Sequence, residues 1–340
     1  MKKACFVIPY FGKLPATMPA FLRSCSENPD YSWLLVTDDR TEYAYPENVQ
    51  CKYCTFSDFV HRVQACFDFP IALNKPYKIC DFRAAFGIIF AEELQEYCFW
   101  GHCDLDQYFG KISRFIKDEI LDQYDKILCL GHFTLFRNTE FINNMYLNAD
   151  IKNGQGYRQA FSEEKHWIFD EWPEDNTSIN RIMKQQNVNT FYRHDAFCDL
   201  VPFCSCFQRY IFDHTTEKWI KENIRNTVFV WDKGTLYRCY YDRDKGLVRE
   251  ETLYVHIRQR KMKMTAFSNN TEVFAISPNR IVSHTGNKAV NAESLLFKSK
   301  LRSLFFPDEL KRRTVLLFAY YRGAVRRVKK IVQTIKGQEV

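Results

Sequence analysis

Short apolar runs alternate with longer amphipathic stretches through the first part of the chain. The runs predict buried strands, and the stretches with an apolar side chain every three or four positions predict helices. The predicted strands cover residues 4–10, 33–37, 49–56, 98–103 and 126–132, and the predicted helices cover 15–25, 57–67 with Ser57 as N-cap, 78–97 and 112–121. Strands that alternate with helices are typical of a mostly parallel sheet with helices on both faces.

The pattern is looser beyond residue 140. Residues 153–157 predict a loop, and residues 177–185 predict a helix. Two apolar runs, 227–231 and 235–241, flank Asp232-Lys233-Gly234, which is a hairpin signal. A further strand is predicted over 252–257.

The composition is that of a globular protein. Of 340 residues, 46% are hydrophobic and 26% are charged, which excludes a mostly disordered chain. The length suits one large domain with additions, or two domains. The apolar run near the N-terminus is short and contains Pro9, so we expect a strand there and no signal peptide. No run of 18 apolar residues occurs, so no membrane-spanning helix is expected.

The thirteen cysteines are odd in number and irregularly spaced, which favours a reducing compartment with mostly buried thiols. Two interpretations of the spacing remain open. Either Cys51 and Cys54 belong to a buried strand, or they form a zinc site with Cys204 and Cys206.

The positive charge is concentrated in the last part of the sequence. Residues 297–340 contain twelve lysines and arginines and three acids, which leaves 36 basic and 38 acidic residues in the rest of the chain. Basic residues interleaved with apolar ones at helical spacing favour a helix on an anionic membrane surface. A solvated helix packed on the body is the structural alternative. Nucleic acid is not expected as a partner, because no recognition motif accompanies the charge.

Asp104 and Asp106 are the most informative pair of polar residues. They follow the apolar run 98–103, and residues two apart in an extended segment point the same way. Two carboxylates at the end of a buried strand make an oxygen-ligand site for a divalent cation, where open α/β sheets bind their ligands. Such a cation commonly holds a nucleotide diphosphate.

Asp104-Leu105-Asp106 after a hydrophobic strand resembles the DxD motif of GT-A glycosyltransferases. More closely, the chain resembles a little-characterised bacterial family of glycosyltransferase-like proteins, often associated with capsule and lipopolysaccharide synthesis. The resemblance runs in consistent order from residue 4 to 264 and leaves out the basic tail. Its matching segments are 78–83, 86–87, 99–106, 131–138 and 254–262. The family more often has Lys-Pro where this chain has Arg83-Ala84.

The resemblance implies a GT-A-like, Rossmann-like fold and a nucleotide-sugar donor, most often a UDP-sugar, with Mn²⁺ or Mg²⁺. In related metal-dependent transferases a histidine after a late strand completes the metal site, and His256 matches that position. The implied metal ligands are therefore Asp104, Asp106 and His256, and imidazole suits Mn²⁺ better than Mg²⁺. The resemblance also implies that the diphosphate is contacted by three basic residues, Arg258, Arg260 and Lys261. Asp104 would border the diphosphate as well.

The resemblance further implies which residues border the nucleotide. A charged cluster before the DxD strand matches Lys78, Asp81 and Arg83. The ends of the first two strands, which contact base and ribose in GT-A proteins, match Pro9, Tyr10, Phe11, Asp38 and Asp39. The structural alternatives are a surface ion pair between Lys78 and Asp81 and polar turns at the strand ends.

Two further pairs are predicted to face the acceptor. Asp170 and Glu171 follow an apolar triplet and would bind the acceptor or act as a general base for inversion. Gly131 and His132 would line the acceptor side of the pocket. The late histidine resembles that of retaining families, which favours retention of configuration.

We therefore expect a catalytic domain over residues 1–265, with a nucleotide half over about 1–110 and an acceptor half over about 111–265. Residues 266–340 would form an extension with basic amphipathic helices. The expected function is metal-dependent transfer of a sugar to a glycan or lipid-linked acceptor in surface polysaccharide synthesis, in the cytoplasm at the inner face of the plasma membrane. The alternatives are a non-catalytic sugar- or nucleotide-binding protein on the same fold and a DxD phosphatase or phosphotransferase.

Overall fold

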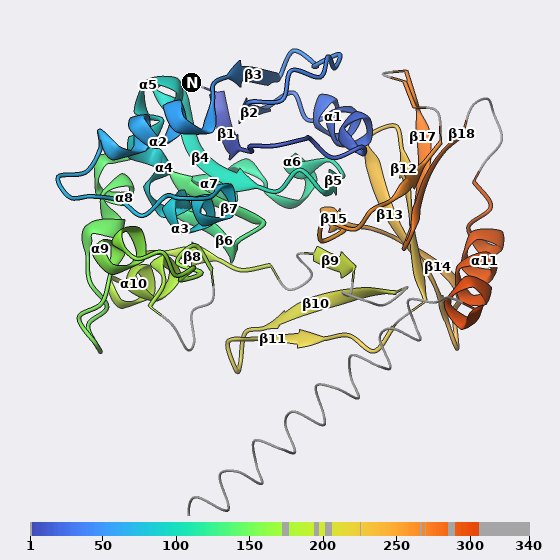
Figure 1. The fold of residues 1–340 in the computed structure, drawn as a ribbon. Helices are drawn as coiled ribbons and strands as arrows, with labels where there is room; N and C mark the ends of the chain where they lie inside the picture. Colours follow the sequence, from blue (N-terminus) through green and yellow to red (C-terminus); the bar gives the residue numbers. More distant parts are fainter. Residues whose placement is uncertain are drawn as a thin grey trace, which may run out of the picture.

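The computed structural model describes residues 2–171, 177–193, 197–200, 206–224, 226–265, 267–268, 270–284 and 290–305. Within these residues the chain forms three β-sheets with helices packed against them (Figure 1). The first sheet and its helices occupy one half of the molecule, and the other two sheets occupy the other half. The predicted α/β class, with mixed sheets flanked by helices, is confirmed.

The first sheet has seven strands in the order β3-β2-β1-β4-β7-β6-β8. β1 pairs in parallel with β2 and β4, and β2 pairs in parallel with β3, so the carboxyl ends of these four strands lie at one edge. β7 runs antiparallel to both of its neighbours. The strands are β1 (Lys2–Pro9), β2 (Tyr31–Thr37), β3 (Val49–Tyr53), β4 (Tyr97–Cys103), β6 (Lys126–Leu130), β7 (Phe133–Arg137) and β8 (Thr190–Phe191).

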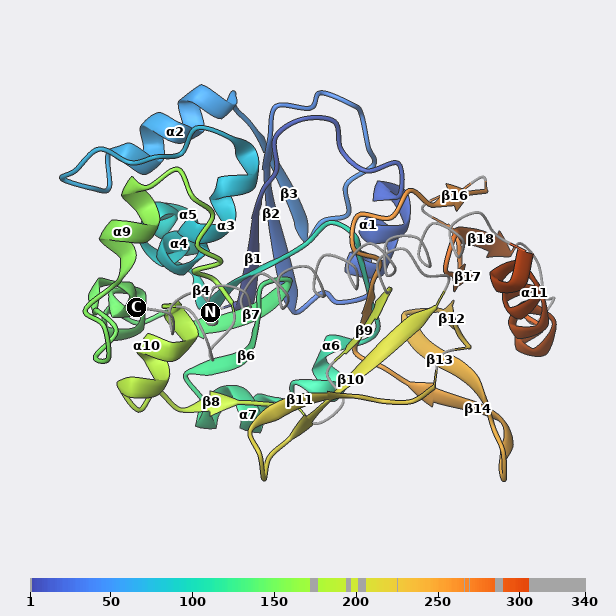
Figure 2. The same cartoon turned by 60° about the horizontal axis from the view of Figure 1, so that its bottom comes forward.

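Helices cover both faces of this sheet (Figure 2). The alternation along β1 shows the two cores: Ala4, Phe6 and Ile8 face one core, and Cys5 and Val7 face the other. The first core is closed by α1 (Met18–Ser26), α6 (Ile112–Phe115) and α7 (Asp118–Gln123). The second is closed by α2 (Phe56–Gln64), α3 (Ile79–Phe82), α4 (Phe86–Ile89), α5 (Ala91–Leu94), α8 (Glu140–Asn143), α9 (Tyr157–Ser162) and α10 (Ile179–Gln185).

Several predicted boundaries are wrong. The N-cap of α2 is Thr55, whose side chain forms a capping box with Asp58, and not Ser57. The predicted helix over 78–97 is a series of short helical pieces, and over residues 78–90 every side chain in it is buried or half-buried. The close approach at Gly87 leaves no room for a side chain, since a Cβ there would lie 2.7 Å from the Trp100 indole nitrogen.

The other two sheets are mostly antiparallel. The second has the order β11-β10-β9-β15-β5, and the third has the order β14-β13-β12-β17-β18-β16. The predicted hairpin at Lys233-Gly234 is confirmed, with both residues at positive φ. The strands are β5 (Gln107–Phe109), β9 (Phe197–Leu200), β10 (Phe207–Asp213), β11 (Lys218–Lys221), β12 (Thr227–Asp232), β13 (Thr235–Asp242), β14 (Gly246–Glu251), β15 (Tyr254–His256), β16 (Lys263–Met264), β17 (Val273–Ser277) and β18 (Arg280–His284).

Strand pairing crosses the predicted domain boundary at residue 265. β17 lies beyond it but pairs with β12, and β16, just before it, pairs with β18. Pairing also crosses the predicted division at about residue 110, because β5 pairs with β15 and so belongs to the second sheet. One folded unit therefore continues through these strands to about residue 284.

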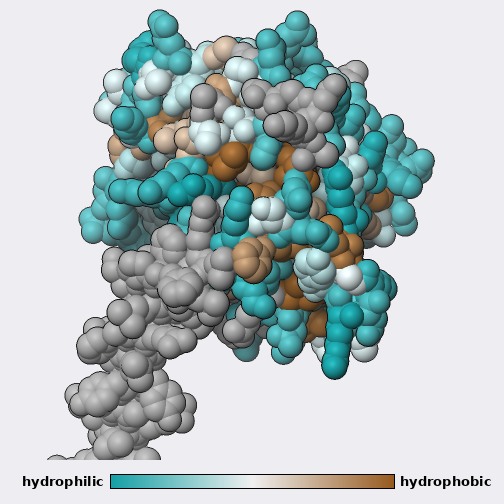
Figure 3. Space-filling view, turned by 90° about the vertical axis from the view of Figure 1, so that its right-hand side faces the viewer, coloured by the Kyte–Doolittle hydropathy of each residue, from teal (hydrophilic) through white to brown (hydrophobic). Residues whose placement is uncertain are grey.

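The outer face of the third sheet is covered by α11 (Ala292–Phe305). Leu296 of α11 packs against Val228 and Val230 of β12, whereas Phe297 points outward and is 63% exposed. Seen from this side, hydrophobic patches lie among mainly hydrophilic side chains (Figure 3). Most of the predicted basic tail, 306–340, lies outside the described residues. Among the described helices, none combines the length and the apolar character needed to cross a membrane.

Candidate metal centre and its cleft

β4 delivers the two aspartates to the candidate centre. Its last five residues are buried, and Gly101 admits the neighbouring strand so closely that a Cβ would lie 2.1 Å from the Thr134 carbonyl oxygen. The chain then turns into β5, and Leu105 packs into the core between Asp104 and Asp106. Both aspartates line the same cleft, so their side chains lie on one side, as their spacing predicts.

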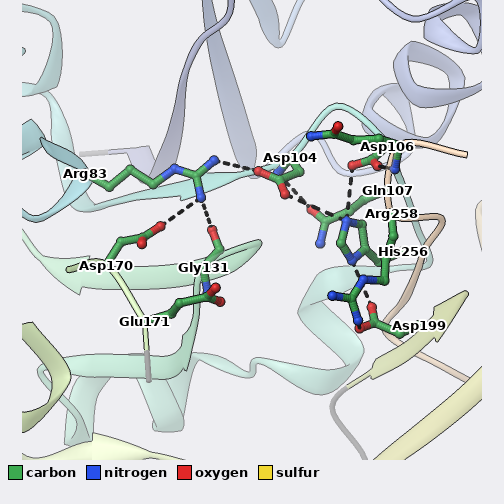
Figure 4. A network of polar contacts seen from close by, with 11 residues as sticks. Arg83, Asp104, Asp106, Gln107, Gly131, Asp170, Glu171, Asp199, His256 and Arg258 are labelled. Carbon is green, nitrogen blue, oxygen red and sulfur yellow. Dashed lines mark hydrogen bonds and ion pairs between the residues drawn. The ribbon is translucent and has the colours of Figure 1, made fainter. Parts of the chain in front are cut away.

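His256 of β15 completes the cluster, because β15 pairs with β5 and places His256 opposite Gln107. His256 Nε2 lies 3.2 Å from Asp106 Oδ1 and 3.7 Å from Asp104 Oδ2 (Figure 4). One donor atom from each of the three side chains falls within 4.8 Å of the others. The grouping of Asp104, Asp106 and His256 that was predicted from the sequence is therefore present.

Asp199 is a member of this centre that the sequence analysis missed. It lies on β9, is 6% exposed, and its Oδ1 is 2.8 Å from Nδ1 of His256. A carboxylate on the far nitrogen of a metal-binding imidazole fixes the ring orientation and raises its basicity. The one available signal was an isolated acid within the apolar segment Phe197–Leu200.

The turn after β15 also points at the centre. Arg258 and Gln259 both have positive φ, 49° and 55°, in a turn closed by the Arg260 N–H donating to the Ile257 carbonyl. Neither residue is a glycine, so this backbone costs on the order of 1–3 kcal/mol per residue. The turn directs the Gln259 N–H at Asp106 Oδ2 and the Arg258 guanidinium at Asp199 Oδ2, 3.2 Å away.

Three carboxylates thus surround one imidazole. Burial alone would lower the pKa of His256, but the charges and hydrogen bonds of Asp106 and Asp199 raise it well above its ordinary value. Burial alone would raise the pKa of Asp106, but His256 and the Gln259 N–H lower it. The centre is therefore built to hold positive charge in a buried place.

Arg83 links this centre to a second group of acids. Its guanidinium lies 2.6 Å from Asp104 Oδ1 and 3.0 Å from Asp170 Oδ2, and it also donates to the Gly131 carbonyl. The Gly131 N–H donates to Glu171 Oε2 at 3.0 Å. The structure therefore brings Arg83, Gly131, Asp170 and Glu171 together beside Asp104 (Figure 4).

The two acids of this group hold protons more tightly than ordinary carboxyls. Burial, with the charges of Glu171 and Asp81, raises the pKa of Asp170 to about 8 against the opposing effect of Arg83. Burial also raises the pKa of Glu171, although the Gly131 N–H opposes it. Groups of this kind suit proton transfer near neutral pH.

Lys78 and Asp81 are not on the cleft. Both side chains are fully buried and are 2.8 Å apart, which contradicts the surface alternative and gives no support to the predicted contact with a nucleotide. Asp81 instead accepts hydrogen bonds from the N–H groups of Trp167 and Phe169, at 3.0 and 2.9 Å. Between them lies Ile168 at φ 56°, so Asp81 holds the strained segment that leads into Asp170.

The residues predicted at the ends of the first two strands differ in where they lie. Pro9, Tyr10 and Phe11 line the cleft, as predicted. Asp38 and Asp39 do not line it; they accept hydrogen bonds from the Gly12 and Leu14 N–H groups, each at 2.7 Å. They therefore shape the loop after β1 rather than contact a ligand directly.

The cleft around the centre has a volume of about 1980 Å³. Arg258, Arg260 and Lys261, which are predicted to bind a diphosphate, line it, and Arg258 contacts Asp199 of the centre. His132 lines it as well, and its ring stacks on that of His256 with centroids 4.5 Å apart. Burial and the charge of His256 lower the pKa of His132 to about 3, so its imidazole is neutral at physiological pH.

Comparison with known protein families shows which family the chain belongs to. A family described as "Family of unknown function (DUF6625)" matches residues 6–285. The chain belongs to this family. The matched DUF6625 region contains the whole centre and ends just past β18, where the third sheet ends in the structure. No curated protein and no solved structure matches the chain.

The side chains of the DUF6625 centre fit a divalent cation. Two carboxylates and one imidazole are the donors that Mn²⁺ accepts, and the fixed far nitrogen of His256 is what a metal-binding histidine requires. Within the described residues, the clusters suited to a metal contain aspartate and histidine only. Cys51 lies on β3 with Cys54 just beyond it, and Cys204 lies outside the described residues, so the zinc alternative stays untested.

Proposed function

We propose that this protein is a metal-dependent glycosyltransferase that uses a nucleoside-diphosphate sugar, with a UDP-sugar as the favoured donor. The observation that carries the proposal is the convergence of Asp104, Asp106 and His256 at the carboxyl end of β4, in a cleft large enough for donor and acceptor. The GT-A-like character of the fold, read from the DxD resemblance, belongs to the same proposal.

The metal centre and the basic turn would hold the donor. Asp104, Asp106 and His256 would bind Mn²⁺ or Mg²⁺, which when bound neutralises charge on the leaving diphosphate. Arg258 pairs with Asp199 at the centre, Arg260 and Lys261 line the same cleft, and the three would hold the phosphate oxygens. Pro9, Tyr10 and Phe11 line the same cleft and would border the base and ribose.

The second group of acids would act on the acceptor. Glu171 lines the cleft with its carboxylate anchored by the Gly131 N–H, so it is placed to orient an acceptor hydroxyl and take up its proton. Arg83 bridges Asp170 and Asp104, so its positive charge would stabilise negative charge that develops between the two groups during transfer. The position of His256 favours retention of configuration by resemblance, in which case these acids orient the acceptor only.

The basic tail would place the enzyme at its acceptor. We propose that residues 297–340, with twelve basic and three acidic residues, bind the anionic inner face of the plasma membrane. A lipid-linked or growing glycan acceptor would then lie close to the cleft, in surface polysaccharide synthesis.

A thermal-shift screen tests the proposal. UDP, GDP, CMP and their sugars are added with and without Mn²⁺ to wild type and to Asp106→Ala. We expect a Mn²⁺-dependent rise in melting temperature with one nucleotide class, lost in Asp106→Ala, because a ligand of the folded state stabilises it by mass action. A folded wild type that no nucleotide shifts would contradict the donor proposal and favour the phosphatase or non-catalytic alternatives.

A further inference from the structure

The cleft is larger than a nucleotide-sugar donor needs, and its wall combines charged and aromatic side chains. Its volume, about 1980 Å³, exceeds the roughly 300–1000 Å³ of a pocket for one small ligand. The metal centre and the basic turn lie on one part of its wall. Another part is aromatic and contains Tyr192, Tyr210, Phe212 and Trp219, which we call the aromatic floor.

The β10–β11 hairpin builds most of this floor. Tyr210 and Phe212 are two residues apart on β10, and the strand pairing places Trp219 of β11 opposite Phe212. Side chains on one face of a strand repeat every second residue, so these three rings share the face that meets the cleft. Ile211 and Ile220 are paired on the opposite face, and Ile220 is 49% exposed.

The rings are held in fixed orientations. Tyr192 stacks on Phe212 with centroids 4.5 Å apart, and Tyr210 stacks on Phe197 at 5.1 Å, with interplanar angles of 9° and 11°. In each pair the phenylalanine is buried, and the tyrosine is only half-buried. Trp219 packs edge-on against both phenylalanines. In the floor, half-exposed tyrosine and tryptophan rings are therefore held in place by two buried phenylalanines.

The floor is continuous with the candidate metal centre. Phe197, under Tyr210, lies two residues from Asp199 on β9, and the His132 ring packs 4.8 Å from Phe197 and 4.5 Å from His256. A molecule seated on the floor would therefore lie beside the reacting end of a donor held at the centre.

The rim of the floor is polar. Lys218, Lys221 and His214 line the cleft around the rings, together with the Lys184–Glu217 ion pair. A pyranose needs this combination, because C–H groups on its face pack on the negative face of an aromatic ring while its hydroxyls need donors and acceptors at the edge. A lipid tail would gain nothing from the polar rim.

We propose that the aromatic floor is the acceptor subsite and that it binds a sugar ring of a glycan, with Trp219 and Tyr210 as its contact residues. This proposal rests on the proposed transferase function, because it assigns the floor to the molecule that receives the sugar. It names carbohydrate, and not lipid, as the part of the acceptor that the protein recognises.

The test uses full-length protein, UDP and Mn²⁺ on an array of defined oligosaccharides with hexose, aminohexose, deoxyhexose and uronic acid ends. We expect wild type to bind at least one class. Trp219→Ala should bind that class roughly tenfold or more weakly, Trp219→Phe should recover part of the binding, and the matched control Ile220→Ala should bind like wild type. The UDP and Mn²⁺ thermal shift should be the same in all four proteins.

Two results would overturn the subsite. One is wild type that binds no glycan on the array, including the case in which it binds lipid vesicles instead. The other is glycan binding that Trp219→Ala leaves unchanged. Failure of the donor proposal gives a different result. Glycan binding would still depend on Trp219, but no nucleotide would raise the melting temperature.

Discussion

At the scale of single residues, the candidate centre depends on side chains that touch one another and not only on the DxD pair. Asp199 fixes His256 from behind with a 2.8 Å contact to Nδ1, and Arg258 in turn pairs with Asp199. Removing such a partner of a metal-binding histidine typically weakens metal affinity about 10- to 100-fold.

We therefore predict that Asp199→Ala binds Mn²⁺ about 10- to 100-fold more weakly than wild type in calorimetric titration. The control Asp213→Ala removes a half-buried acid of the neighbouring strand β10 that does not contact the centre, and it should leave the affinity unchanged. Equal affinities in Asp199→Ala and wild type would contradict the supporting role of Asp199 at a metal-binding His256.

Asp170 makes stability depend on pH in a defined direction. Its pKa is raised to about 8 by burial and by neighbouring carboxylates, so the folded state binds a proton that the unfolded chain releases near pH 4. This contribution to the free energy of unfolding is fully present below pH 4 and is lost as pH rises towards about 8. Measured by urea unfolding with a metal chelator present, Asp170→Asn should lose less stability than wild type over that range. Parallel pH profiles would contradict the prediction.

At the scale of elements, the buried ion pair between Lys78 and Asp81 holds in place the segment that carries Asp170. Asp81 binds the N–H groups on both sides of Ile168, and Lys78 donates to Asp81 and to the carbonyls of Ala160 and Lys165. This single cluster therefore ties α3 to the segment that carries Asp170.

We predict that Asp81→Asn lowers the free energy of unfolding by about 3–5 kcal/mol, because it leaves Lys78 as a buried charge without a counter-ion. It should also speed hydrogen exchange at Trp167 and Phe169. The matched control Asp68→Asn breaks an exposed ion pair with Arg158 and should cost less than about 1 kcal/mol. Similar unfolding curves for the two variants would show that the buried cluster does not stabilise the segment.

The same scale explains what the sequence could predict. The strands of the first sheet are buried on both faces and form apolar runs, so β1, β2, β4 and β6 were predictable. β10, β11, β14 and β18 are half-exposed and alternate with polar residues, and they left too weak a pattern. Asp199 was missed with them, because only the pairing of β9 with β15 brings it to His256.

Site residues divide in the same way. Asp104 and Asp106 were predictable because they follow a recognisable buried strand, whereas His256 was assigned through the resemblance to metal-dependent transferases. Lys78 and Asp81 were assigned to the nucleotide through the resemblance, and their helical spacing showed only that they share a face. Spacing alone cannot distinguish a buried pair from one at a cleft.

At the scale of the whole molecule, the folded body carries the cleft and the tail carries the positive charge. We predict that full-length protein binds vesicles containing anionic lipid at physiological salt and is released by high salt. Replacing Arg326, Arg327, Lys329 and Lys330 by Gln should weaken binding strongly, since each basic residue near the surface contributes about 1 kcal/mol. Co-sedimentation with anionic and with neutral vesicles measures this. If the protein does not bind anionic vesicles, the proposed membrane association is wrong.

The central claim is that Asp104, Asp106 and His256 hold a divalent cation that binds a nucleoside diphosphate. Anomalous diffraction at the manganese edge, from crystals grown with Mn²⁺ and UDP, tests it most directly. We predict one manganese peak among these three side chains, with the diphosphate of UDP on its open side and the basic turn of Arg258 beside it. Crystals with UDP bound in the cleft and no manganese at these residues, or with manganese only elsewhere, would contradict the claim.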